Sequence, residues 1–255
     1  MTGSDGRSVA GSGGATVAGP GGRSAAEPAS PFRLAELTWP EVAARGEIVL
    51  AVPVGSTEQH GPHLPLSTDT DVAVALAEAV ARRRSDLLVA PAVAYGSSGE
   101  HSDFTGTLSI GPEATELLLV ELGRSASATA RRLLLVSAHG GNAEPVTRAA
   151  ARLRAEGVDL LVFAPRWPGD AHAGWTETSV QLALRPGLVR TGDLAAGNTA
   201  ELSTLMPALR RHGVRAASPN GVLGDPTGAS AAEGRRLLAA AVDTLLDAVV
   251  AWVGR

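Results

Sequence analysis

The chain of 255 residues contains no cysteine and no lysine. Without cysteine, disulfide bridges, thiol nucleophiles, iron–sulfur clusters and cysteine-ligated zinc sites are excluded. Any bound metal ion must therefore be held by histidine, aspartate or glutamate. The 22 positive charges are all arginine. Together with the frequent alanine and glycine, this bias indicates a GC-rich coding sequence, and we give it no functional weight.

Aromatic residues make up only 3% of the chain, whereas hydrophobic residues make up 44%. The core must therefore consist of alanine, valine and leucine, and the apolar content excludes a disordered chain. The net charge of −4 and the lack of a long basic run argue against nucleic acid as the main partner. No window holds about 18 uninterrupted apolar residues, so we predict no membrane span.

Residues 1–32 are rich in glycine, serine, alanine and proline, which is typical of a flexible tail. This segment lacks the apolar stretch of roughly 7–15 residues that a signal peptide needs, so we expect a cytoplasmic protein. Residues 33–255 contain neither an internal repeat nor a linker, and we predict that they form a single domain.

From residue 34 onward, short apolar runs alternate with segments of helical periodicity. This alternation predicts an α/β fold with a mostly parallel sheet, in which functional residues lie at the carboxyl ends of the strands. We expect strands at 48–54, 87–93, 133–137 and 160–164, and helices at 70–84, 112–131, 144–156, 173–184 and 229–253.

Glu58, His60 and Asp69 lie in the run GSTEQHGPHLPLSTD, which follows the first expected strand. Residues two apart in an extended segment point the same way, so Glu58 and His60 can face one point. The stiff, proline-containing loop then delivers Asp69 where the next helix begins. Two carboxylates and an imidazole are suitable ligands for zinc, manganese or iron. Alternatively, Asp69 simply caps the helix.

Two further clusters follow later strands. His139 precedes Gly-Gly-Asn, and either lies in the same layer as the first cluster or is a structural histidine capped by Asn142. His172 is expected in a loop and Glu177 on the first turn of a helix, where an acid also favours the helix dipole. Together the three clusters contain three histidines and three acids, enough for two divalent ions that share a carboxylate and activate a hydroxide. The residues therefore predict a metal-dependent hydrolase.

Other residues near the expected site are assigned less specific roles. Trp167 and Trp175 either wall the substrate pocket or pack in the core. His101 is a candidate pocket residue and, with Glu100, a candidate support that orients the metal ligands. His212 is expected at the surface.

Five segments of the chain resemble the creatininase family, the creatinine amidohydrolases. The resemblance covers about residues 34–253, and its first motif is long and specific. The segments are VPVGSTEQHGPHLPLSTDTDVA, EHSDFTGTLSIG, SAHGGN, HAGWTETS and GVLGDPTGASAAEG.

The resemblance implies a three-layer α/β/α sandwich, two divalent metal ions per chain (zinc, iron or manganese) and a homo-oligomer of six or more chains. It places Glu58, His60, Asp69 and His139 on metal-binding positions, with Asp69 as the bridge. Glu177 is the candidate for the remaining metal carboxylate and is counted among the catalytic residues. His172 is the candidate proton donor to the leaving nitrogen, or a group that orients the substrate.

One position departs from the creatinine-hydrolysing members, which carry a glutamate where this chain has Gly141. This departure argues against creatinine as the substrate. The whole pattern is most similar to family peptidases of mycofactocin maturation, which implies release of a C-terminal Val-Tyr dipeptide from a modified precursor peptide during redox-cofactor biosynthesis. The alternatives are a small-molecule amidohydrolase or formamide deformylase of the same family, and a non-catalytic small-ligand binding protein.

Overall fold

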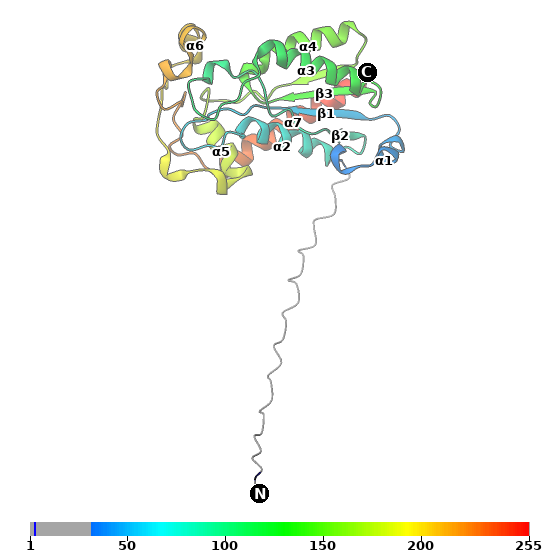
Figure 1. Cartoon of the computed structure of the whole chain (residues 1–255), viewed down its shortest axis with the longest axis horizontal. Helices are drawn as coiled ribbons and strands as arrows, with labels where there is room; N and C mark the ends of the chain where they lie inside the picture. Colours follow the sequence, from blue (N-terminus) through cyan, green and yellow to red (C-terminus); the bar gives the residue numbers. More distant parts are fainter. Residues whose placement is uncertain (1–2, 4–31, 255) are drawn as a thin grey trace. The chain divides into compact units, whose positions relative to one another are not determined.

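A computed structural model describes residue 3 and residues 32–254 (Figure 1). The expected tail at 1–32 falls almost entirely outside these described residues. Within them, no helix combines the length and the apolar character needed to cross a membrane.

Four parallel strands form the central sheet, in the order β2-β1-β3-β4. The register places Leu50 beside both Leu88 and Leu133. All four expected strands are confirmed, but the second is shorter than its apolar run because it ends two residues before Pro91, which has no backbone N–H to donate. The strands are β1 (Val49–Val54), β2 (Leu87–Val89), β3 (Arg132–Ser137) and β4 (Leu160–Phe163).

Helices cover both faces of the sheet, which confirms the expected three-layer sandwich (Figure 1). Val49 and Ala51 pack into the core on one face, whereas Leu50 and Val52 pack into the core on the other. Because both faces are buried, the middle residues of the strands are apolar rather than alternating between apolar and polar. The first face is covered by α2 (Thr68–Ala81), α5 (Trp175–Leu184) and α7 (Ala231–Val253), and the second by α3 (Gly111–Ala126) and α4 (Ala143–Ala155).

Several further elements were not expected from the sequence. Helix α1 (Trp39–Ala43) begins with a capping box between Thr38 and Glu41. Helix α6 (Leu202–Ala217) lacks a side-chain cap, contains Pro207 and is kinked at Gly213, which weakens its periodic signal. The described residues also form 3-10 turns η1 (Leu34–Glu36), η2 (Gly99–His101), η3 (Gly140–Asn142), η4 (Pro186–Leu188) and η5 (Thr191–Asp193).

The strand order positions the functional site. From β1 the chain adds β2 on one side and then β3 on the other, so the connections that leave β1 and β3 diverge. Open α/β sheets bind ligands at such a switch point, outside the carboxyl ends of the strands. The polar motifs that follow β1 and β3 both lie there.

Candidate metal centre

The segment that leaves β1 carries two of the expected ligands, Glu58 and His60, both fully buried. The Nδ1 atom of His60 lies 3.0 Å from the backbone oxygen of Glu58. A carbonyl oxygen only accepts, so Nδ1 carries a hydrogen, and Nε2 is the nitrogen that can bind a metal ion once it loses its own proton. This Nε2 lies 3.2 Å from Oδ1 of Asp69 and 3.8 Å from Oε2 of Glu177. The Glu58 carbonyl thus holds the His60 ring in the orientation that a metal ligand requires.

Asp69 occupies the first turn of α2 and is directed at two histidines. Its Oδ1 faces Nε2 of His60, and its Oδ2 lies 2.9 Å from Nδ1 of His139. The hydroxyl of Ser56 donates to Oδ2 over 2.6 Å, which fixes the carboxylate. The residue that precedes α2 is Ser67, so Asp69 does not cap the helix. A carboxylate whose oxygens face opposite ways has the orientation expected of a bridging ligand.

His139 follows β3, and its Nε2 lies 2.9 Å from the backbone oxygen of Ser97. In the metal-free protein Nε2 therefore carries a hydrogen, and Nδ1 faces Oδ2 of Asp69. Asn142 does not cap this histidine: its side chain accepts from the Ser97 N–H and donates to the Gly55 carbonyl, each over 2.9 Å. Asn142 instead ties together the loops that surround the site.

His172 lies in the loop before α5, and Glu177 lies on the first turn of that helix, as expected. The Nε2 of His172 donates to the backbone oxygen of Gln59 over 2.9 Å. Its Nδ1 therefore faces the carboxylates of Glu58 and Glu177, at 3.7 and 4.0 Å. Between them, Ala173 has a φ of 53° and donates its N–H to Oε2 of Glu177 over 2.6 Å. This strained backbone orients the Glu177 carboxylate.

Gln59 is a site residue that the sequence reasoning missed. The backbone N–H of Gly61 donates to its Oε1 over 2.8 Å, which fixes the orientation of the amide. Its Nε2 then donates to Nδ1 of His101 over 2.8 Å and to the Gly221 carbonyl over 3.1 Å. In an extended segment the side chain of Gln59 points away from those of Glu58 and His60. In the sequence, only its polar character close to a strand end could have indicated a role.

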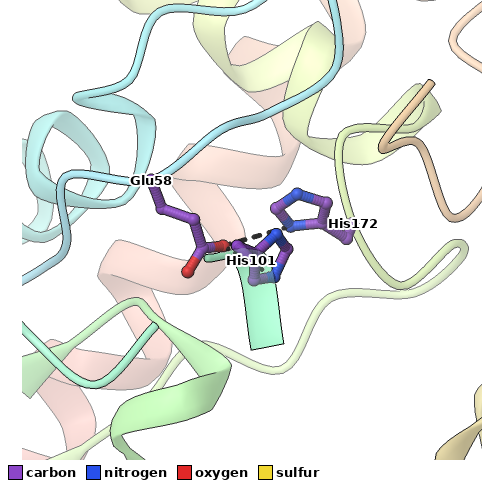
Figure 2. A group of neighbouring side chains, drawn as sticks. All are labelled: Glu58, His101 and His172. Atoms are coloured by element: carbon purple, nitrogen blue, oxygen red, sulfur yellow. Dashed lines mark ion pairs between the residues drawn. The ribbon is translucent and has the colours of Figure 1, made fainter. Parts of the chain in front are cut away.

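His101 and His172 converge with Glu58 (Figure 2). Because Nδ1 of His101 accepts from Gln59, its Nε2 carries the hydrogen, and this atom lies 3.1 Å from Oε1 of Glu58. Burial, together with the nearby charges of His60 and His139, lowers the pKa of His101 to about 3. Burial also lowers the pKa of His172 well below its usual value, so both imidazoles are neutral at physiological pH.

Burial and neighbouring charges also shift the pKa values of the expected metal ligands. Burial raises the pKa of Glu58 to about 7 and also raises that of Glu177. For Asp69, burial is outweighed by the charges of His60 and His139, and its pKa falls well below 3.8. Burial lowers the pKa values of His60 and His139, but the neighbouring carboxylates outweigh this effect and raise both to about 10. A cluster of side chains whose pKa values are strongly shifted is typical of a functional site.

The donor set fits divalent metal ions. Both carboxylate oxygens of Glu58 are buried and make no hydrogen bond to any described residue, although histidine nitrogens lie 3.1–3.2 Å away. A buried carboxylate in this state is suited to bind a metal cation. Mixed imidazole and carboxylate ligands suit zinc, manganese or iron. Four triads each have ligand atoms within 4.8 Å of one another: Glu58–His101–His172, His60–His172–Glu177, Glu58–His60–Asp69 and Glu58–Glu100–His139.

A cavity of about 890 Å³ opens onto the cluster. His101 lines it, as expected for a pocket residue, and so does His212, whose side chain is exposed. The expectation for the two tryptophans requires correction, because neither Trp167 nor Trp175 lines this cavity. Both pack against the core beneath α5 and α7, and Trp167 borders a separate cavity of about 590 Å³. Helix α5 presents Glu177 to the site and Trp175 to the core.

Comparison with known proteins places the chain among amidohydrolases. The family model described as creatinine amidohydrolase matches residues 35–249. A mycofactocin precursor peptide peptidase of Mycobacterium tuberculosis is 54% identical over 214 residues, covering 80% of this chain and 85% of that protein. The peptidase of the same name from Mycobacterium ulcerans is 51% identical over 224 residues, covering 84% and 86%. A creatinine amidohydrolase of Pseudomonas putida is 33% identical over 190 residues, covering 61% and 73%.

Solved creatininase structures share the fold. One crystal structure of creatinine amidohydrolase superposes with a TM-score of 0.70 at 28% identity, covering 86% of this chain and 96% of that one. A creatininase structure described as the manganese form has a TM-score of 0.71 at 28% identity, covering 86% and 97%. On its sequence, its fold and the cluster at the end of its sheet, this chain belongs to the creatininase family of hydrolases.

Proposed function

We propose that this chain is a two-metal peptidase that removes a C-terminal Val-Tyr dipeptide from the modified precursor peptide of mycofactocin. The observation that carries the proposal is the 54% identity to precursor peptide peptidases over 80% of the chain. Similarity to the creatinine amidohydrolase is lower and covers only 61% of the chain. The buried ligand cluster supports the hydrolytic chemistry.

The contacts suggest how the ligands divide between two ions. Glu58 and His139 pair at 3.2 Å, and His60 and Glu177 pair at 3.8 Å, with Asp69 between the pairs. We assign one ion to each pair and the bridging position to Asp69. Zinc, iron or manganese bound there would lower the pKa of a shared water and polarise the scissile carbonyl.

His172 is the residue we assign to proton transfer. Its Nδ1 is unprotonated and faces the ligand carboxylates, while its Nε2 is held by the backbone oxygen of Gln59. From this position Nδ1 takes the proton that the attacking water loses. As the oxygen–carbon bond forms and the carbon–nitrogen bond breaks, the same atom returns the proton to the departing amine.

The cavity suits a peptide end. Its volume of about 890 Å³ lies in the range of sites that enclose ligands larger than a single small ring. Met206 and Leu209 provide an apolar wall. Arg210 stands beside them, exposed and without a hydrogen bond or ion pair to any described residue. We infer that its guanidinium receives the C-terminal carboxylate of the substrate, because arginine binds carboxylates in a bidentate manner.

Metal content and substrate choice test the proposal. Elemental analysis of the purified chain should find about two divalent ions, whereas a metal-free protein would support a binding role instead. The loaded protein should then be offered the modified precursor peptide, cyclic amides and formamides in parallel. Cleavage of the peptide alone supports the proposal, and turnover of only the small amides would favour the amidohydrolase alternative.

We also infer from the family resemblance that the chain forms a homo-oligomer of six or more copies, and we propose that it acts in the cytoplasm. Light scattering coupled to size-exclusion chromatography tests the first inference, with a monomer as the contradicting result. Fractionation of the source cells tests the second.

A further inference from the structure

Glu100, which the sequence offers only as a candidate support for the metal ligands, has no part in the division of ligands proposed above. It lies in turn η2 and lines the cavity together with Glu58 and His139. In the described residues 32–254, no hydrogen bond or ion pair engages its carboxylate. A half-buried carboxylate without a partner indicates that it binds a ligand.

The carboxylate of Glu100 occupies the space beside Gly141. A Cβ atom built on Gly141 would lie 2.7 Å from Oε1 of Glu100 and 2.5 Å from Nε2 of His139. Ligand atoms of Glu58, Glu100 and His139 all lie within 4.8 Å of one another. Two ligands of one ion, each bonded at about 2.0–2.2 Å, are separated by up to about 4.4 Å. Glu100 therefore needs only a small side-chain adjustment to share an ion with Glu58 and His139.

Hydrogen bonds hold the backbone on both sides of Glu100. The N–H of Ser98 donates to the hydroxyl of Ser109 over 2.9 Å, and the N–H of His101 donates to the Ser98 carbonyl over 3.0 Å. The neighbouring buried carboxylate supplies independent support for a cation at this end, since both oxygens of Glu58 lack a hydrogen bond within the described chain. A second carboxylate at a defined position beside an unsatisfied one is suited to bind the same ion.

We propose that Glu100 is an additional ligand of the ion held by Glu58 and His139, supplied from turn η2 across the space that Gly141 leaves open. This inference rests on the proposed metal-dependent function. It assigns the residue to one ion of the pair and not to the one near His60 and Glu177.

Metal binding by Glu100→Gln tests the proposal without depending on activity. The matched control is Glu144→Gln, which removes the same charge from the same cavity, where Glu144 pairs with Arg148. Both variants and the original chain are stripped with chelator and titrated with Zn²⁺ against a competing chromophoric chelator. We expect one of the two sites to weaken at least about 100-fold in Glu100→Gln alone, because removing a group that only supports a ligand already costs about 10–100-fold.

Cobalt(II) substitution supplies a second readout, because the visible absorption of bound cobalt reports its ligands. Glu100→Gln should change the spectrum, and Glu144→Gln should not. If zinc affinity falls equally in both variants, the effect comes only from the lost charge in the cavity, and the proposal is overturned. Unchanged zinc affinity in Glu100→Gln would also overturn it. If the original chain itself binds no zinc, the proposed function fails. If it binds two ions and Glu100→Gln binds them equally well, only this inference fails.

Discussion

Nδ1 of His139 lies 2.9 Å from Oδ2 of Asp69, and the opposite oxygen of the same carboxylate faces His60. This arrangement joins the loop after β3 to the first turn of α2. Replacing Asp69 with asparagine removes one anionic oxygen and leaves the two histidines without their shared partner.

We therefore expect Asp69→Asn to lose metal affinity at least about 100-fold and to lose hydrolysis with it. Asp71→Asn is the matched control, because Asp71 lies on the same helix but pairs with Arg185 outside the site. That change should cost about 0–1 kcal/mol of stability and leave the metal content unchanged. Retention of both ions in Asp69→Asn would contradict its bridging role.

Gly141 has no room for a side chain, whereas its neighbour Gly140 does. A Cβ atom on Gly141 would lie 2.2 Å from the backbone oxygen of Ser97, but one on Gly140 meets nothing within 4 Å. Gly141→Ala should displace His139 and cost about 1–3 kcal/mol of stability through overpacking. Chemical denaturation and zinc titration check this, with Gly140→Ala as the neutral control. Equal behaviour of the two variants would show that the loop adapts freely.

Gln59 orients His101 and should be required for full activity. Gln59→Ala removes the donor to Nδ1 of His101, so we expect activity to fall about 10–100-fold while metal content is retained. Gln181→Ala also removes a buried amide, one that bonds to Thr68 and Asp71 away from the histidines. It should lower stability but not specific activity. A Gln59→Ala enzyme with unchanged kcat would remove Gln59 from the site.

The metal-free protein should lose stability as pH rises. Neighbouring carboxylates raise the pKa values of His60 and His139 from 6.5 to about 10 in the folded state. A group whose pKa is raised on folding stabilises the fold fully below its unfolded value and loses this effect as pH passes the folded value. Urea denaturation of chelated protein should therefore show falling stability from pH 6.5 to 10.

Metal-loaded protein serves as the reference for that measurement. Metal ligation requires unprotonated imidazoles, so the loaded protein should not show the same decline. A chelated protein whose stability is flat across this range, or rises, would show that the two histidines are not charged in the folded metal-free state.

Arg210 should discriminate a free peptide carboxylate from an amide. Arg210→Ala is expected to raise KM about 10-fold or more with little change in kcat, because a charge-assisted pair contributes about 1.5–3 kcal/mol. Amidating the C terminus of the substrate should weaken binding to the original enzyme but not to Arg210→Ala. Equal sensitivity of both enzymes to amidation would exclude Arg210 as the carboxylate receptor.

The sequence was sufficient to predict those parts of the molecule that follow from local periodicity. Apolar runs bounded by glycine and proline located all four strands, and the strand-end rule brought Glu58, His60, Asp69, His139 and Glu177 to one edge. Helix α6 was not predicted from the sequence, because Pro207 and the kink at Gly213 interrupt its helical periodicity.

Contacts between distant segments could not be read from spacing. Gln59 bonds to His101, 42 positions away, and to Gly221, 162 positions away, and no local pattern in the sequence indicates either contact. Trp167 and Trp175 are close in sequence to His172 and Glu177, but Trp175 on α5 and Trp167 in the loop before it both pack against the core. Proximity in sequence therefore misplaced them in the pocket.

Mass spectrometry of the modified precursor peptide in heavy-oxygen water tests the central claim most directly. The metal-loaded enzyme should release unlabelled Val-Tyr and leave a shortened peptide that carries one heavy oxygen in its new carboxylate. Glu58→Gln, which removes a ligand charge from the cluster, should leave the peptide intact. An intact peptide with the loaded enzyme, or equal cleavage by Glu58→Gln, would contradict the account.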